Sequence, residues 1–428
     1  MEEWKDYRKS PWGYIPNHWG ISSIKDETEV VTDYVANGSF ASLAENVKYK
    51  SEKDYAVLIR LVDYNNQFKG DFVFIDKDAY DFLGKSKLYG DEIIISNVGA
   101  NVGTVFKCPH LDFKMSLAPN SIMVKFKGNN DFYYYWLRSR FGQHMLQSIV
   151  TGSAQPKFNK TNFRDLLIPV PPISEQKSIA SILKSLDDKI EVNWRINDNL
   201  EQQAQALFKS WFVDFEPFKN GEFVESELGM IPKGWRVKEL TDIAEISKVS
   251  INPQKQPQIE FKHYSIPSYD DGMKPEIQLG EEIKSNKFVI KNKMTLFSKL
   301  NPRIKRVWFV DKLDDNSICS TEFVPYKAKA ESKSSFLYSL INSQGFYDFV
   351  MSMVNGATGS HQRFHPEDSL RYKIAYNETY CSKYCEIATP IINKILDNRE
   401  EARRLADLRD TLLPKLMSGE LKVNEIEI

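Results

Sequence analysis

The chain has 428 residues, enough for about three domains at ~150 residues each, and its 42% hydrophobic, 27% charged and 13% aromatic residues are typical of a folded protein. These values exclude a short peptide scaffold and argue against a disordered chain. Because 57 Lys and Arg nearly balance 58 Asp and Glu, binding to a polyanion must come from local patches, and histone-like coating of nucleic acid is not expected.

The first block of the chain mixes short strands with a helix. Four predicted strands are separated by Gly and Asn turn residues. They are 55–62, 71–75, 92–96 and 103–106. A helix is predicted over 131–150, with Phe132 and Trp136 on its buried side. The pattern indicates an α/β block with a β-rich part.

A long helix with coiled-coil periodicity is predicted next, over about 176–213. From Ile179 onward, apolar or Asn residues recur at alternating spacings of four and three, which is typical of a coiled-coil seam. The seam positions are Leu183, Leu186, Ile190, Asn193, Asn197, Leu200, Ala204, Leu207 and Trp211. At about 1.5 Å per residue this helix would be roughly 57 Å long. That length exceeds an ordinary domain helix.

The remainder of the chain repeats this plan after a predicted linker over 214–230. Gly13-Tyr-Ile-Pro, followed by Trp19, recurs as Gly229-Met-Ile-Pro, followed by Trp235. Residues 132–152 also align with 336–356 without a gap. The sequence therefore predicts a tandem duplication of a globular block followed by a helix.

The second copy of the helix has a weaker seam. Its seam positions are Ile391, Ile395, Asn398, Ala402, Leu405, Arg409, Leu412 and Leu416. Pro390 and Pro414 mark a start, a kink or a stop of this helix. Because a seam Asn costs stability unless it meets a partner, Asn193 and Asn398 predict a mutual hydrogen bond that fixes the register of the two helices. The alternative is that each helix docks on its own block.

Motifs of catalysis and nucleotide binding are absent from the sequence. There is no G-x-x-x-x-G-K-[ST] loop, no G-x-G-x-x-G, no H-E-x-x-H and no Asn/Asp-Pro-Pro-Tyr/Phe motif of amino-methyltransferases. Gly99-Ala-Asn-Val-Gly103 predicts a turn, since Asn301 and Lys305 replace its glycines in the second half. No catalytic residue is therefore predicted.

Metal binding and membrane association are not expected either. Only four cysteines occur, and the close pair Cys381 and Cys385 lacks the second pair that a structural zinc site needs. No run approaches the ~18 apolar residues of a membrane span, and the N-terminus lacks an apolar signal segment. We expect a cytoplasmic protein without a metal.

Basic loops stand at matched places in the two halves. The stretch from Lys284 to Arg306 has no acidic residue and contains Lys287, Lys291, Lys293, Lys299, Arg303 and Lys305. Two small-residue loops carry further basic residues, which are Lys157, Lys160 and Arg164 in the first half and His361, Arg363 and His365 in the second. Such clusters fit contact with phosphates and base edges, although a solvated face is the alternative. Two blocks on a rigid spacer would suit two half-sites of DNA.

These features together resemble the specificity subunit of type I restriction-modification enzymes. The resemblance lies in the repeated Gly-x-Ile-Pro-x-x-Trp, in Ile168-Pro-Val-Pro-Pro172 with Glu175-Gln-Lys177, and in Leu412-Leu-Pro-Lys-Leu-Met-Ser-Gly-Glu420. It runs from about residue 11 to 421. The chain departs from the family at the second helix, where Ala375-Tyr-Asn-Glu378 replaces the Pro-Pro-x-x-Glu-Gln-x-x-Ile entry of 171–179.

The resemblance implies an α+β fold with two similar α/β target recognition domains separated by two long antiparallel helices that form a coiled coil. The expected boundaries are 1–172 for the first domain, 173–213 for the first spacer helix, 214–376 for the linker and second domain, and 377–428 for the second helix and tail. It also implies a non-catalytic subunit that reads a bipartite, asymmetric double-stranded DNA target. The expected partners are two DNA methyltransferase subunits, which carry S-adenosylmethionine, and motor-nuclease subunits; no cofactor is expected on this chain.

Lys and Arg would then position phosphates while long polar side chains read base edges. The DNA-binding candidates are Asn97, Asn101, Gln155, Lys157 and Lys160 in the first domain and Lys299, Arg303, Lys305, Arg306, Gln362 and Arg363 in the second. Because segments 99–103 and 301–305 differ, unlike half-sites are predicted. Phe208 and Phe212, outside the seam, are candidates for methyltransferase contact; the alternative is that they pack against the blocks.

Two other hypotheses remain open at this point. One is a coiled-coil adaptor that joins proteins and never binds nucleic acid. The other is a solitary nuclease or methyltransferase with an unrecognised site. The salt dependence of duplex binding separates the DNA reader from the adaptor.

Overall fold

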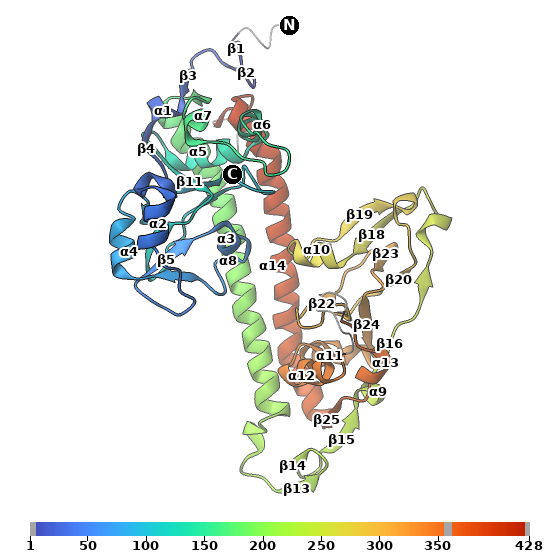
Figure 1. The fold of residues 1–428 in the computed structure, drawn as a ribbon. Helices are drawn as coiled ribbons and strands as arrows, with labels where there is room; N and C mark the ends of the chain where they lie inside the picture. Colours follow the sequence, from blue (N-terminus) through green and yellow to red (C-terminus); the bar gives the residue numbers. More distant parts are fainter. Residues whose placement is uncertain (1–5, 355–361, 424–428) are drawn as a thin grey trace. The chain divides into compact units, whose positions relative to one another are not determined.

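The computed structural model describes residues 6–354 and 362–423, and the chain divides into two compact units. Unit 1 is Met1–Ile190 with Arg404–Ile428, and unit 2 is Glu191–Arg403. Each unit contains one globular block and a part of each of two long helices. These helices are α8 (Ile173–Phe212), green in Figure 1, and α14 (Glu378–Ser418), red in Figure 1.

Unit 1 is built on two four-stranded sheets and two two-stranded ones. The strand orders are β4-β11-β8-β9, β6-β5-β10-β7, β1-β2 and β12-β3, and β5 and β10 are parallel. The strands are β1 (Tyr7–Ser10), β2 (Gly13–Pro16), β3 (Gly20–Ser23), β4 (Thr28–Asp33), β5 (Ala56–Ile59), β6 (Val73–Ile75), β7 (Lys87–Leu88), β8 (Ile93–Ser96), β9 (Val105–Lys107), β10 (Lys114–Leu117), β11 (Ser121–Phe126) and β12 (Leu167–Val170). The short helices are α1 (Ile24–Glu27), η1 (Tyr34–Asn37), α2 (Phe40–Asn46), α3 (Leu61–Asn65), α4 (Lys77–Phe82), α5 (Asn130–Arg138), α6 (Arg140–Ser148) and α7 (Lys160–Arg164).

Unit 2 repeats this topology, with one additional strand, β17, at the edge of its second sheet. Its strand orders are β16-β24-β21-β22, β17-β20-β23-β18-β19, β13-β14 and β15-β25, and β18 and β23 are the parallel pair. The strands are β13 (Phe223–Ser226), β14 (Gly229–Pro232), β15 (Arg236–Glu239), β16 (Ala244–Ile246), β17 (Ser250–Ile251), β18 (Glu260–Tyr264), β19 (Glu276–Leu279), β20 (Lys287–Val289), β21 (Met294–Ser298), β22 (Val307–Val310), β23 (Ser317–Cys319), β24 (Phe323–Ala328) and β25 (Lys373–Tyr376). The short helices are η2 (Glu216–Phe218), α9 (Leu240–Ile243), η3 (Pro253–Lys255), α10 (Ile266–Asp270), η4 (Gly280–Glu282), η5 (Glu331–Lys333), α11 (Ser334–Ile341), α12 (Gln344–Ser352) and α13 (Pro366–Ser369). The duplication seen in the sequence is therefore also present in the strand order.

The four predicted strands of the first block are confirmed as β5, β6, β8 and β9, with somewhat different ends. The single helix predicted over 131–150 is wrong, because the structure has α5 and α6 instead. Ser139 has an extended backbone between them, and its Oγ accepts a hydrogen bond from Gly142 N at 3.3 Å. A Cβ on Gly142 would lie 2.2 Å from Trp136 O, so this tight junction requires glycine.

The segment 214–230, predicted to be a linker, is partly folded. β13 within it pairs with β14 in the same register as β1 pairs with β2. The ring of Phe218 lies 5.0 Å from that of Trp235 and 4.5 Å from that of Tyr380, measured between centroids. These aromatic contacts anchor a segment whose polar composition alone indicated a linker.

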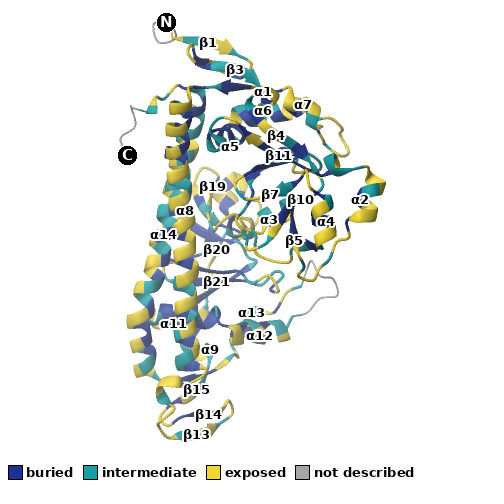
Figure 2. Cartoon of the chain, turned by 90° about the vertical axis from the view of Figure 1, so that its left-hand side faces the viewer, coloured by how far each residue is buried: buried dark blue, intermediate teal, exposed yellow. Residues whose placement is uncertain are grey.

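The helices α8 and α14 pack against each other in antiparallel orientation within each unit. In unit 2, Asn398 Nδ2 donates to Asn197 Oδ1 at 2.9 Å and Asn193 Nδ2 donates to Glu401 Oε2 at 3.0 Å. In unit 1, Arg409 Nη1 donates to Asp187 Oδ1 at 2.6 Å. Figure 2 shows the exposed outer sides of these helices in yellow. The predicted pairing of the two long helices is confirmed.

The prediction that Asn193 and Asn398 form a hydrogen bond with each other is wrong. Both side chains are only 1% exposed and both are bonded across the helix pair, but Asn398 faces Asn197. The reason is the stagger of the antiparallel pair, which a single-sequence seam pattern does not reveal. Asn197 Nδ2 donates in turn to Ile395 O at 3.2 Å.

The second long helix begins at Glu378. Asn377 Oδ1 accepts hydrogen bonds from Thr379 N at 3.0 Å and Tyr380 N at 3.3 Å, which caps the helix. Pro390 and Pro414 lie inside α14, so they neither start nor stop it. None of the helices in the described part of the chain is both long and apolar enough to cross a membrane.

The Asn197 and Asn398 side chains should show strong energetic coupling. Asn398→Ala leaves Asn197 Oδ1 buried without its donor, so we expect a loss of about 1–3 kcal/mol in the free energy of unfolding. The double change to Leu should cost less than the sum of the single changes, as measured in a double-mutant cycle by denaturant unfolding. The control is Asn199→Ala, which lies on the exposed side of α8, the helix that carries Asn197. Additive losses would show that the pair is not coupled.

Candidate nucleic-acid interface

Two loops that are far apart in the sequence meet in unit 1. The loop after β8 runs beside the loop after α6, where Gly99 N donates to Pro156 O at 2.9 Å. Phe158 N donates to Asn97 O at 3.1 Å, and Val98 and Lys157 form an antiparallel bridge. The buried ring of Phe158 anchors the second loop. Asn101, Gln155 and Lys157 are thereby carried by one pair of loops.

Unit 2 contains the same loop pair. Asn301 N donates to Gln362 O at 2.9 Å, which matches the bond from Gly99 to Pro156. Leu300 and Arg363 form an antiparallel bridge, which matches Val98 and Lys157. Phe364 is buried as Phe158 is. Arg303 and Arg363 therefore both lie in the loop pair of unit 2.

The first loop of unit 1 is a turn, as predicted, and the first loop of unit 2 is a turn as well. Val102 N donates to Gly99 O at 3.1 Å, and Ile304 N donates to Asn301 O at 2.9 Å. Gly99 has a φ of 103° and Asn301 a φ of 46°, a left-handed conformation that glycine and asparagine adopt most readily. The two loops thus share a backbone shape but present different side chains.

The candidates of unit 1 differ in how accessible they are. Asn101, Gln155 and Lys157 are exposed. Lys160 Nζ lies 3.1 Å from Asp33 Oδ1, so its charge is already paired. Asn97 is half-buried and its Nδ2 donates to Phe158 O at 3.1 Å, so its side chain secures the loop pair.

In unit 2, Arg303 is exposed and Lys299 and Gln362 are half-buried. Arg363 is exposed and pairs with Glu322, an acidic neighbour that the sequence pattern missed. His361, a basic residue predicted for the same loop, lies outside the described residues.

The prediction that Arg306 contacts DNA is wrong. Its guanidinium is buried, with Nε 2.7 Å from Asp270 Oδ1 and Nη2 2.8 Å from Asp270 Oδ2. The adjacent candidate Lys305 is half-buried, and its ammonium donates to the carbonyl oxygen of Asn342. Burial lowers the pKa of Lys305. Both cations therefore link segments that are distant in the sequence, Lys305 to Asn342 and Arg306 to Asp270.

The basic run from Lys284 to Arg306 is likewise less positive in space than in sequence. Lys287 is 7% exposed, and burial lowers its pKa. Lys293 Nζ lies 2.7 Å from Glu331 Oε1. The run is therefore partly internal and partly neutralised, although Lys284 and Lys291 remain exposed outside the loop pair.

A hollow that the sequence did not indicate adjoins the unit 1 loops. It has a volume of about 610 Å³, and its lining includes Phe40, Tyr49, Asn97 and Asn120. Phe40 is 81% and Tyr49 56% exposed. Exposed aromatic rings beside polar groups suit contact with bases, but isolated aromatic residues in a sequence give no such signal.

Comparisons with known proteins agree with this two-unit architecture. The family model described as type I restriction modification DNA specificity domain matches residues 16–202. The specificity subunit of type I restriction enzyme MjaIX from Methanocaldococcus jannaschii is 27% identical, over 98% of each chain. Residues 16–202 therefore match the DNA specificity domain of type I restriction-modification enzymes, and the whole chain is similar to a specificity subunit.

One further relative and one solved structure are similar to this chain. The HindI specificity subunit from Haemophilus influenzae is 26% identical, over 62% of this chain and 71% of its own. The crystal structure of the type I system S subunit from M. genitalium shares the fold, with a TM-score of 0.55 at 13% identity, over 93% of this chain and 96% of its own. The similarity to specificity subunits supports DNA recognition as the role of this chain.

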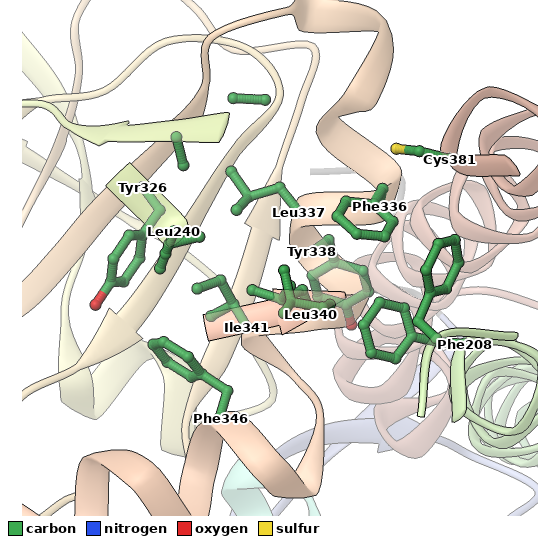
Figure 3. Close-up of a cluster of buried hydrophobic side chains, with 14 of the residues drawn as sticks. Phe208, Leu240, Tyr326, Phe336, Leu337, Tyr338, Leu340, Ile341, Phe346 and Cys381 are labelled. Carbon is green, nitrogen blue, oxygen red and sulfur yellow. The ribbon is translucent and has the colours of Figure 1, made fainter. Parts of the chain in front are cut away.

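The prediction that Phe208 and Phe212 contact a methyltransferase is wrong. Both are buried in the core of unit 2, at 1% and 3% exposure. Figure 3 shows Phe208 beside the cluster that contains Phe336 and Tyr338. They lie outside the helix seam because they face the globular block. The exposed apolar residues of α8 in unit 2 are instead Val192, Trp194 and Ile196.

Proposed function

We propose that the chain reads a bipartite, asymmetric double-stranded DNA target with one loop pair from each unit. The observation that carries this proposal is the recurrence of one loop arrangement, held by equivalent hydrogen bonds, with different exposed side chains. In this proposal the shared backbone holds the reading side chains, and the substitutions between units change which bases they read. The domain boundaries, 1–172 and 214–376 with the two helices between and after them, follow from this assignment.

The available side chains favour unlike half-sites. Unit 1 presents Asn101 and Gln155, whose amides suit bidentate contact with adenine. Unit 2 presents Arg303 in the place of Asn101 and Arg363 in the place of Lys157, and arginine suits bidentate contact with guanine. Lys157 and Lys299 supply charge for phosphate contacts next to these groups. The expected target therefore has an adenine-reading half and a guanine-reading half.

Two methyltransferase subunits are the proposed protein partners, with motor-nuclease subunits in the full complex. S-adenosylmethionine would be bound by the methyltransferase and not by this chain. Val192 and Ile196, exposed at 44% and 39% and one turn apart on α8, offer an apolar surface for one of these contacts.

Selection of duplexes from a randomised pool tests the proposal. The full chain, in complex with its methyltransferase, should select two unlike half-sites at a fixed gap. Affinity for the selected duplex should fall with salt at a logarithmic slope near −0.9 per phosphate contact. A perfectly palindromic target would contradict the asymmetry. A response that is flat with salt would favour a protein adaptor.

A further inference from the structure

We propose that Glu322 positions Arg363 to read a guanine base in the half-site bound by unit 2. The inference rests on the proposed function and assigns a chemical target to one residue of the interface. Glu322 lies between β23 and β24, and Arg363 lies in the second loop of the pair. The two residues are far apart in the sequence and form an ion pair in the structure.

The geometry of the ion pair leaves one edge of the guanidinium for DNA. Arg363 Nε lies 3.0 Å from Glu322 Oε2, and Arg363 Nη2 lies 3.1 Å from Glu322 Oε1. This side-on pairing uses the Nε hydrogen and one Nη2 hydrogen. The end-on edge, formed by Nη1 and the other Nη2 hydrogen, keeps the two parallel donors that match N7 and O6 of guanine. The Arg363 side chain is 44% exposed, so this edge can meet a ligand.

Both members of the pair stand on fixed backbone. Glu322 O accepts from Lys299 N at 2.8 Å, and Glu322 N donates to Ser320 Oγ at 3.2 Å. Arg363 is bridged to Leu300 and is followed by the buried Phe364. A guanidinium held on such supports loses less rotamer entropy on binding than a free arginine does.

The carboxylate argues for a base contact over a phosphate contact. A negative charge beside the guanidinium repels a phosphate and so weakens an arginine that serves only as a counter-charge. A guanine edge carries no net charge, and an oriented pair of donors is what its recognition needs. Glu322 therefore weakens the attraction of Arg363 for phosphates and orients its donors toward a base.

The pair has no counterpart in unit 1. Asn120 takes the place of Glu322, since Asn120 O accepts from Asn97 N at 3.1 Å as Glu322 O accepts from Lys299 N. Lys157 takes the place of Arg363, and a lysine lacks the two parallel donors. A guanine read in this way is thus expected in one half-site only.

The test compares variants of the full chain, bound to its methyltransferase, on the selected duplex and on duplexes changed at each position. For the wild type, replacing one guanine in the unit 2 half-site should weaken binding about tenfold to 100-fold. Arg363→Lys, which keeps the charge, should reduce that preference to less than about threefold. Glu322→Gln should reduce the preference several-fold, while it strengthens binding to unrelated duplex and steepens the salt slope, because the freed arginine can contact phosphate.

The matched control is Glu245→Gln. Glu245 pairs with Lys327 at 3.6 Å, near the opposite end of β24 from Glu322, and its change should alter neither the guanine preference nor the salt slope. An unchanged guanine preference in Glu322→Gln would overturn the inference. An equal loss on every duplex in Arg363→Lys would also overturn it, and both results would leave the proposed function standing. A wild type that selects no sequence would contradict the proposed function itself.

Discussion

Phe208→Ala should lower the free energy of unfolding by about 3–5 kcal/mol, because it opens a cavity in the core of unit 2. The Phe208 ring centroid lies 5.3 Å from that of Phe212, 5.6 Å from that of Phe336 and 5.9 Å from that of Tyr384. Phe208 packs α8 against the globular block of unit 2, so its removal weakens the packing between them. Denaturant unfolding of the full chain, followed by tryptophan fluorescence, measures the change.

The control for this substitution is Phe40→Ala in unit 1. Phe40 is 81% exposed, so its removal should change the free energy of unfolding by less than about 0.5 kcal/mol. If Phe208→Ala left the stability unchanged but abolished methyltransferase binding, the sequence-based assignment of Phe208 to a partner surface would be restored.

The repeat and the long helices could be predicted from sequence because both depend on local, periodic signals. Seam residues such as Leu183 and Ala204 recur at a spacing that is typical of a paired helix. A seam pattern shows which side of a helix faces its partner helix. It does not show that a second side, carrying Phe208 and Phe212, packs on the adjacent block.

The interface could be predicted only in part. The turn at Gly99 and the basic loop residues could be predicted, since they depend on short segments. The pairing of Arg306 with Asp270 and of Arg363 with Glu322 was not, because each joins segments that only the tertiary fold brings together. An acid-free run of sequence therefore overstated the accessible positive charge.

The stagger of the two helices could not be predicted from the sequence for a similar reason. The equivalence of Asn193 and Asn398 in the repeat does not place them opposite each other, since an antiparallel pair can slide by one turn. The structure sets Asn398 against Asn197. The buried polar contacts fix this stagger, because sliding the helices by a turn would leave the amides without partners.

Lengthening both helices should lengthen the gap between the half-sites. Three heptads inserted between Ile190 and Glu191, and three between Arg403 and Arg404, preserve the seam and fall where the chain divides into its two units. At about 1.5 Å per residue they add roughly 32 Å, close to the ~34 Å of one DNA helical turn. We therefore expect the preferred gap to grow by about ten base pairs with both half-sites unchanged.

A flexible insertion of equal length between Asn220 and Gly221 is the matched control. These residues are exposed and lie outside both helices, so the insertion should leave the gap unaltered. Binding of the lengthened variant to each half-site confirms that both units remain folded.

Sequencing the methylated bases in DNA from cells that express the lengthened chain with its methyltransferase measures the gap directly. We expect the same two half-sites, about one helical turn further apart than with the natural chain. The same half-sites at the natural gap would contradict it, because the helices would then not set the distance between the two DNA-reading units.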